Sequence, residues 1–129
     1  MTLHRQFSIT PSALEKMKSH LSGAYPKEGC GILAGDESGS IEEVFALTNK
    51  AAATQKTAHY EMDPLSVYEL EKKAEEMGYS ILGFYHSHPD CEAKMSQEDK
   101  DHMMPQMLYV IASVNAGECG QIRGYVKDM

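Results

Sequence analysis

Two segments of the chain carry hydrophobic residues at helical spacing, and each follows a cap residue and a proline. The first predicts an amphipathic helix over 11–22 that Gly23 would end. The second predicts a helix over 64–77, with Gly78 at the position just beyond its end. The hydrophobic positions are Leu14, Met17 and Leu21 in the first segment, and Leu65, Tyr68, Ala74 and Met77 in the second.

Short apolar or alternating runs predict strands between and after these helices. They are residues 4–9, 30–34, 41–48, 60–62, 80–85, 107–114 and 121–127. A polar turn over 36–40 predicts a hairpin, and 49–56 reads as a loop. Ser96 begins a short helix that Pro105 should end. Helices and strands are therefore intermixed, which predicts an α/β or α+β fold with a mixed sheet.

Composition predicts one ordinary globular domain over 1–129, because 42% of the residues are hydrophobic and 24% are charged. A formal net charge of −7 argues against nucleic acid and against an anionic membrane surface as partners. No signal peptide and no apolar run of about 18 residues is visible. Cys30, Cys91 and Cys119 show no CxxC spacing, so a reducing cytoplasm is the expected compartment.

The candidate chemistry lies between Gly83 and Asp101. His86 and His88 are two residues apart at the end of an apolar strand, so both imidazoles share one face. Asp99 lies in the first turn of the helix begun by Ser96, which can bring its carboxylate back toward the histidines. Two histidines, one aspartate and an open fourth position are typical of a catalytic zinc site.

Each part of this pattern also has a simpler interpretation. An isolated His-x-His is weak evidence for metal, and Ser96-x-x-Asp99 alone is an ordinary capping motif. Cys91 could close the site as a fourth, structural ligand. The combination at fixed spacing favours the catalytic interpretation over these alternatives.

That combination resembles the JAMM (MPN-plus) metallopeptidase family, whose pattern is His-x-His, seven residues, Ser, two residues, Asp. Pro89 to Met95 supplies the seven residues here, and 97–98 supplies the two. The segment Pro26–Gly35 is similar to the family's upstream segment, with Glu28 at its glutamate position. The resemblance covers almost the whole chain and implies a mixed, mostly antiparallel sheet flanked by helices, of the JAMM and cytidine-deaminase-like type.

The resemblance also implies roles for these residues. His86, His88 and Asp99 would bind one Zn²⁺ per chain, with a water as the fourth ligand. Glu28 would act as general base toward that water and pass the proton to the leaving amine. Ser96 would donate a hydrogen bond to the developing oxyanion. Whether its hydroxyl also caps the helix stays open at this stage.

For the other residues that could take part in chemistry, the pattern favours structural roles. Ser87 alternates away from the two histidines, and Cys30 reads as a small buried hydrophobe. His102 lies one helical turn after Asp99, where a solvated face is favoured over a role behind the ligands. A methionine cluster around the motif predicts core packing, with a substrate groove as the alternative. Its members are Met95, Met103, Met104 and Met107.

The chain looks like the compact prokaryotic type of the family. That resemblance implies a ubiquitin-like or sulfur-carrier protein as substrate, cleaved at its Gly-Gly tail by a monomer or a homodimer. Deaminase and zincin signatures are absent from the sequence. A non-catalytic MPN-type interaction module and a zinc hydrolase for another small amide are the alternatives.

Overall fold

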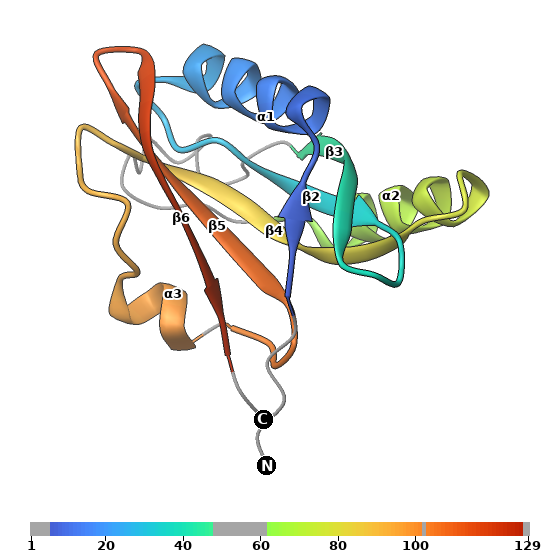
Figure 1. Ribbon diagram of the computed structural model, residues 1–129. Helices are drawn as coiled ribbons and strands as arrows, with labels where there is room; N and C mark the ends of the chain where they lie inside the picture. The colour runs from blue at the N-terminus through green and yellow to red at the C-terminus, as the bar shows by residue number, and fades with distance from the viewer. Residues whose placement is uncertain (1–5, 48–61, 102, 128–129) are drawn as a thin grey trace.

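The computed structural model describes residues 6–47, 62–101 and 103–127, except for the side chain of Glu98. Over these residues, six strands form one sheet in the order β1-β3-β2-β4-β5-β6, drawn in Figure 1. The strands are β1 (Ser8–Ile9), β2 (Cys30–Gly35), β3 (Ser40–Leu47), β4 (Ser80–Pro89), β5 (Leu108–Asn115) and β6 (Glu118–Val126). The helices are α1 (Pro11–Ala24), α2 (Pro64–Glu76) and α3 (Gln97–Asp101). The expected mixed sheet flanked by helices is confirmed.

Most neighbouring strands are antiparallel, and the exceptions are β1 with β3 and β4 with β5. The parallel pair β4 and β5 is joined by a crossover that contains α3. Such a crossover leaves at the carboxyl end of the first strand, where ligands bind in open α/β sheets. His86 and His88 lie at that end of β4.

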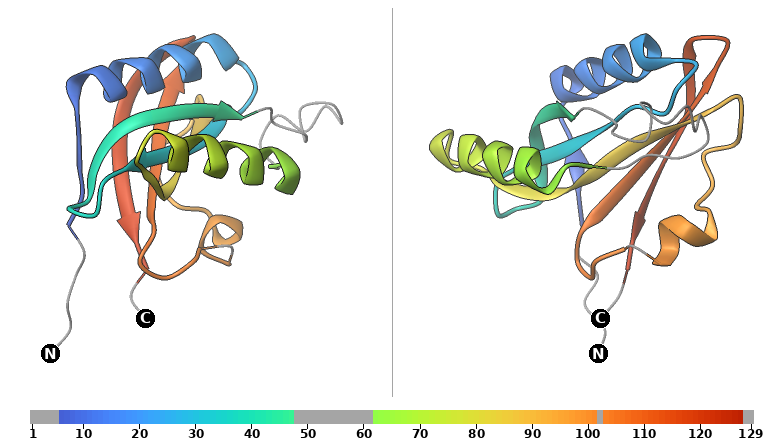
Figure 2. Two further views of the ribbon diagram at one scale, coloured as in Figure 1. Left: turned by 90° about the vertical axis from the view of Figure 1, so that its right-hand side faces the viewer. Right: turned by 180° about the vertical axis from the view of Figure 1, so that it is seen from behind.

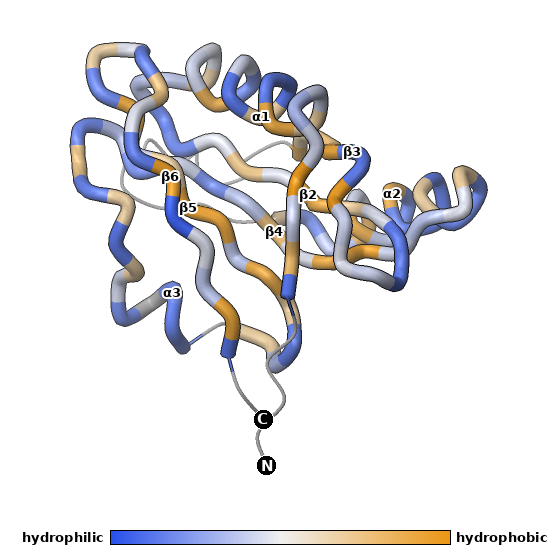
Figure 3. Tube along the Cα trace, viewed as in Figure 1, coloured by the Kyte–Doolittle hydropathy of each residue, from blue (hydrophilic) through white to orange (hydrophobic). Residues whose placement is uncertain are grey.

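The two faces of the sheet carry separate apolar clusters, covered by different helices. The α1 residues Ala13, Met17 and Leu21 pack on one face. Ala74 of α2 packs on the other, together with residues of the crossover. Figure 2 shows α1 and α2 on opposite sides of the sheet. Figure 3 shows hydrophobic residues along β4 and β5, whereas α3 is hydrophilic.

The sequence predicted that Gly23 would end the first helix, but the helix continues to Ala24. A glycine inside a helix costs about 1 kcal/mol relative to alanine, which packing can offset. The helix ends where Tyr25 takes an extended conformation before Pro26. A residue before proline is pushed out of the helical region, so the proline and not the glycine sets the boundary.

The second helix agrees closely with its prediction. It spans Pro64–Glu76, and Gly78 has a φ of +85° just beyond the C-cap residue Met77. The Tyr79 amide donates back to the carbonyl of Ala74, which satisfies a carbonyl of the last turn.

The hairpin turn over 36–40 and the remaining strands also match within a few residues. The strand expected over 60–62 lies largely outside the described residues, as does the loop over 49–56, and Met62 itself is not in a strand. Of the described helices, none is long and apolar enough to cross a membrane.

Candidate metal centre and catalytic site

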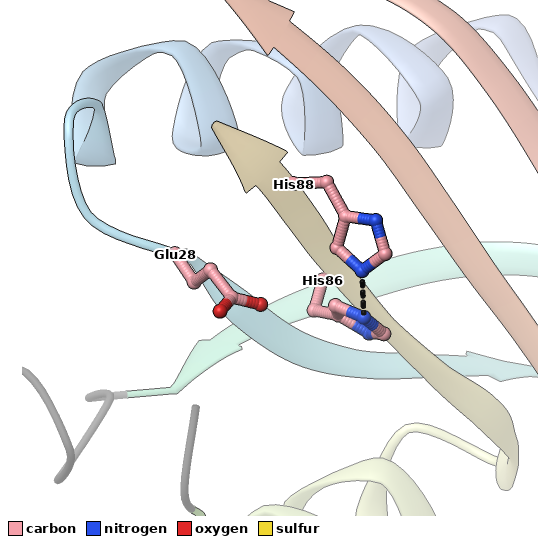
Figure 4. A group of neighbouring side chains, drawn as sticks. All are labelled: Glu28, His86 and His88. Atoms are coloured by element: carbon pink, nitrogen blue, oxygen red, sulfur yellow. Dashed lines mark hydrogen bonds between the residues drawn. The ribbon is translucent and has the colours of Figure 1, made fainter. Parts of the chain in front are cut away.

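Strand β4 presents both histidines on the face that carries α2. His86 pairs across the sheet with Cys30 on β2 and with Ile111 on β5, and it is 2% exposed. His88, two residues later, lies at the more open edge of the site, with 16% of its side chain exposed. The Nε2 atoms of the two rings are 3.2 Å apart, as Figure 4 shows. The strand period therefore places both imidazoles together, as expected.

Asp99 is brought to both histidines by its short helix. The Ser96 hydroxyl accepts from the Asp99 amide at 3.0 Å, and the Asp99 Oδ2 accepts from the Ser96 amide at 3.0 Å. This is a reciprocal capping arrangement at the helix N-terminus. The same carboxylate lies 3.3 Å from the Nε2 of His86 through Oδ1, and 3.3 Å from that of His88 through Oδ2.

These donor atoms fit a zinc ion. A tetrahedral ion with ligand bonds of about 2.0–2.1 Å separates its donors by about 3.3–3.4 Å. The Nε2 atoms of His86 and His88 are 3.2 Å apart, which is close to one edge of such a tetrahedron, and each lies 3.3 Å from a different oxygen of the Asp99 carboxylate. Two imidazoles and one carboxylate are also a donor set that zinc accepts. The sequence-predicted ligands are thus brought together in a suitable arrangement.

The pKa shifts of His86 and Asp99 favour the protonation states that bind a cation. Burial lowers the pKa of His86, which favours the neutral imidazole. Burial alone would raise the pKa of Asp99, but hydrogen bonds with His86 and His88 outweigh it and hold that pKa well below its usual range. The Nδ1 of His88 lies 3.0 Å from the Glu92 carbonyl, which can only accept. When the His88 ring is neutral, its proton therefore belongs on Nδ1, and Nε2 keeps a lone pair that can bind a cation.

His88 is the group that most favours a proton. Burial works to lower its pKa, but the contacts with Asp99 and the Glu92 carbonyl, together with the negative charge of Glu28, raise it overall. A ligand must be deprotonated to bind a metal, so ion binding at this site would be coupled to proton release from His88.

Glu28 completes the cluster from a different segment. It lies between α1 and β2 and is only 5% exposed. Its carboxylate and the two imidazoles offer ligand atoms that all lie within 4.8 Å of one another. Figure 4 shows the carboxylate directed toward the histidines. A buried carboxylate so close to two imidazoles can exchange a proton with a water held among them.

The segment that carries Glu28 is held at one end by β4 and at the other by the residue directly after that strand. The Gly29 amide donates to the Ser87 hydroxyl at 2.9 Å, and the Ser87 amide donates to the Gly29 carbonyl at 3.0 Å. At the other end, the Tyr25 hydroxyl donates to Asp90 Oδ2 at 2.7 Å. Ser87 therefore faces away from the histidines, as predicted, and its hydroxyl holds the residue next to Glu28.

Asp90 connects several segments of the chain through hydrogen bonds, a role that the sequence did not indicate. Its Oδ1 accepts from the amide of Ala116 in the β5–β6 turn, and its own amide donates to the carbonyl of Val114. It has a φ of +55°, which is uncommon for a residue other than glycine. Three segments thus meet at one carboxylate directly after the histidine strand. An Asp after His-x-His-Pro carries no sequence signal for such contacts, since they join distant parts of the chain.

The other sequence candidates take structural positions. Burial raises the pKa of the Cys30 thiol to about 12, so it stays protonated and packs as a small apolar group. Cys91 is exposed after β4, and it is not one of the side chains that converge with the histidines in the described part of the chain. Met95 is buried, and Met103 packs against the same cluster. Met107 also packs there, whereas Met104 is 47% exposed and His102 lies outside the described residues.

Comparison with known proteins identifies the family of the chain. A model of prokaryotic homologues of the JAB domain matches residues 10–123. The chain is 31% identical over 113 residues to a desampylase of Haloferax volcanii, which covers 84% of this chain and 81% of the relative. It is also 31% identical over 122 residues to a CysO-cysteine peptidase of Mycobacterium tuberculosis, covering 91% and 80%.

Solved structures share the fold. A protein from Desulfitobacterium hafniense superposes with a TM-score of 0.73 at 27% identity, over 96% of this chain and 94% of that one. A JAB1/MPN domain protein from Archaeoglobus fulgidus superposes with a TM-score of 0.61 at 16% identity, over 94% and 86%. The family model covers nearly the whole chain and includes every residue of the site. The chain therefore belongs to the prokaryotic JAB-domain family, within the JAMM/MPN fold.

Proposed function

We propose that this chain is a zinc-dependent isopeptidase or peptidase that hydrolyses an amide bond at the C-terminal Gly-Gly tail of a ubiquitin-like or sulfur-carrier protein. The observation that carries the proposal is the convergence of His86, His88 and Asp99, whose nearest donor atoms lie 3.2–3.3 Å apart, beside the buried carboxylate of Glu28. A zinc ion bound there supplies Lewis acidity and a water of lowered pKa.

The residues of the chain would handle the protons and the developing charge. Glu28 takes a proton from the attacking water as the carbon–oxygen bond forms. It then delivers that proton to the amide nitrogen as the carbon–nitrogen bond breaks, which leaves a free carboxyl group and a free amine. The Ser96 hydroxyl donates a hydrogen bond to the carbonyl oxygen as negative charge develops there. Its capping bond uses only a lone pair, so acceptance from Asp99 and donation to substrate are compatible.

The substrate class is supported by the names of the relatives. One is a desampylase, and another is a peptidase named for a bond between the protein CysO and cysteine. Both relatives match about four fifths of their length to this chain. A small modifier or carrier protein joined through its C-terminus is therefore the substrate that we propose, with either a peptide or an isopeptide bond.

The test is a cleavage assay on defined conjugates. A ubiquitin-like protein that ends in Gly-Gly is prepared with a C-terminal cysteine, with a short peptide extension, and as an isopeptide on a lysine side chain. Each is incubated with the zinc-loaded protein, and the products are read by intact mass. Release of the unmodified Gly-Gly terminus is expected. Failure on all three, under conditions where zinc is bound, would contradict the proposed substrate class.

Two variants separate metal binding from proton transfer. Glu28→Gln keeps the size of the side chain but cannot accept a proton, so it should retain about one zinc and lose turnover by a hundredfold or more. Asp99→Ala removes one of three protein ligands and should lose most of the zinc. Metal analysis with the cleavage assay distinguishes them. A Glu28→Gln protein without zinc would make Glu28 a ligand instead of a base.

A further inference from the structure

The segment that carries Asp99 has little regular structure of its own. Between the end of β4 and the start of β5, the described residues form only the five-residue helix α3. An isolated helix of that length is unstable in water, because it forms too few hydrogen bonds to offset the free-energy cost of nucleation. The position of Asp99 must therefore be set by contacts with the rest of the fold.

Two tyrosines of the sheet provide such contacts on either side of Asp99. The Tyr125 hydroxyl donates to the carbonyl of Ala93 at 2.8 Å, six residues before Asp99. The Tyr109 hydroxyl accepts from the amide of Met104 at 2.8 Å, five residues after it. Ala93 is fully buried, so the first contact holds a part of the segment that is already packed on the sheet.

The two tyrosines are direct neighbours in the sheet. Tyr109 on β5 pairs with Tyr125 on β6 in the antiparallel register, and both rings contact the apolar cluster on the face of the metal centre. Residues directly opposite in such a pair have Cβ atoms about 4.5–5.5 Å apart. One rigid pair thus holds both ends of the segment. Ser113, also on β5, adds a bond from its hydroxyl to the carbonyl of Cys91 at 2.5 Å, near the start of the same segment.

We propose that Tyr109 and Tyr125 are positioning residues for the metal ligand Asp99. Their hydroxyls hold the two ends of segment 93–104, so that the Asp99 carboxylate faces both histidines before any metal binds. The inference rests on the proposed zinc site, because it gives the held carboxylate a ligand role. The hydroxyl contacts described for the two tyrosines are with backbone groups of the segment, so each tyrosine would act through the segment.

The expected effect is on metal affinity. Groups that orient metal ligands typically contribute about 10–100-fold in affinity, and these two act at a distance of several residues. We therefore expect Tyr125→Phe and Tyr109→Phe each to weaken zinc binding by about tenfold. Both changes remove one oxygen and keep the ring in the apolar cluster, so the variants should fold.

The experiment measures the zinc dissociation constant by competition with a chromogenic chelator, together with the visible absorption spectrum of the Co²⁺-substituted protein. Tyr68→Phe is the matched control, since Tyr68 is 53% exposed on α2 and is not on this segment. The same Tyr125→Phe change is also made in an Asp99→Ala background, where weak binding is followed by direct titration. If Tyr125 acts through Asp99, the second background should show less than a twofold effect.

The possible results are distinct. Tenfold weaker zinc binding in both tyrosine variants, a Co²⁺ spectrum of reduced tetrahedral intensity and no effect in Asp99→Ala would support the inference. Wild-type affinity in Tyr125→Phe and Tyr109→Phe would overturn it while leaving the zinc site intact. An equal loss in the Asp99→Ala background would also overturn it, because the tyrosines would then act on the fold in general. A wild-type protein that binds no zinc would overturn the proposed function and this inference together.

Discussion

The hydroxyl of Ser96 is expected to serve both the fold and the transition state, and Ser96→Ala separates these contributions by their size. In the structure, Ser96 accepts a hydrogen bond from the Asp99 amide at the start of α3. That bond occupies one lone pair, and the hydroxyl proton is directed elsewhere. Ser96 is exposed next to Asp99, the proposed ligand, so a substrate carbonyl can reach it.

The two roles predict different magnitudes. Loss of an N-cap costs about 1 kcal/mol, which lowers the melting temperature of a domain of this size by roughly 3–5 °C. Loss of an oxyanion donor costs about 2.7–4 kcal/mol in the barrier, which corresponds to roughly a hundredfold to a thousandfold in turnover. The Asp99 carboxylate still accepts from the Ser96 backbone amide after the substitution, so zinc should be retained.

The assay compares three variants for melting temperature, zinc content and turnover at saturating conjugate. Ser96→Ala should melt a few degrees lower, keep its zinc and turn over at least a hundredfold more slowly. Ser96→Thr keeps a hydroxyl that caps and donates, so it should recover much of both properties. Ser96→Asp caps well but cannot donate when ionised, so it should recover stability alone. If Ser96→Ala kept near-normal turnover and lost only stability, the oxyanion role would be wrong and the hydroxyl would be a helix cap.

Further predictions concern residues behind the site. Ser87→Ala leaves the buried Gly29 amide without its acceptor, so we expect a loss of about 1–3 kcal/mol in urea unfolding and slower turnover with zinc retained, and Ser87→Thr should restore both. Wild-type stability in Ser87→Ala would contradict this. Gly31→Ala places a Cβ in steric overlap with the Tyr85 ring, so calorimetry should show a loss of about 1–3 kcal/mol in stability from overpacking, and an unchanged melting temperature would show that the ring moves freely. Burial lowers the pKa of His20 below 6.5, so the unfolded chain binds its proton first and stability should fall as the pH drops through 6.5. His20→Asn should lose that part of the pH dependence between pH 7.5 and 5.5, and identical curves for the two zinc-saturated proteins would refute it.

Local signals in the sequence identified the elements that depend on local chemistry. The helix over 64–77 was predictable because its proline, its apolar spacing and Gly78 all lie within or next to the element. Gly23 was misleading because a glycine near a helix end can either end the helix or lie within its last turn. The true end depends on Pro26, which restricts the residue before it.

The convergence of His86, His88 and Asp99 was predictable for a related reason. His86 and His88 share a strand, so their common face follows from the strand period alone. Asp99 was placed by its spacing from them, and its capping bond with Ser96 could be read from four adjacent positions. The carboxylate's position over both imidazoles is tertiary, however, and no local rule sets it.

The groups that hold the site together could not be predicted from the pattern. Tyr125 and Ala93 are 32 residues apart, and Tyr25 and Asp90 are 65 apart. A tyrosine on an edge strand gives no sign in the sequence that its hydroxyl reaches a loop carbonyl. These contacts depend on strand order and register, and the β5–β6 pairing itself contains an irregularity between Ala112 and Val114.

The site therefore consists of one rigid strand, which carries the two histidines, and two acidic residues, Glu28 and Asp99, which are held in place by separate sets of contacts. β4 supplies both histidines from the centre of the sheet, where backbone pairing on either side leaves little freedom. Glu28 is held to that strand through Ser87 and Asp90, and Asp99 is held to the sheet by hydroxyls of β5 and β6. Because the two attachments share no described side-chain hydrogen bond, they can be loosened independently. Loosening the Glu28 segment should slow proton transfer while zinc remains fully bound. Loosening the Asp99 segment should instead lower the affinity for zinc, with a smaller effect on the turnover of the zinc-loaded protein.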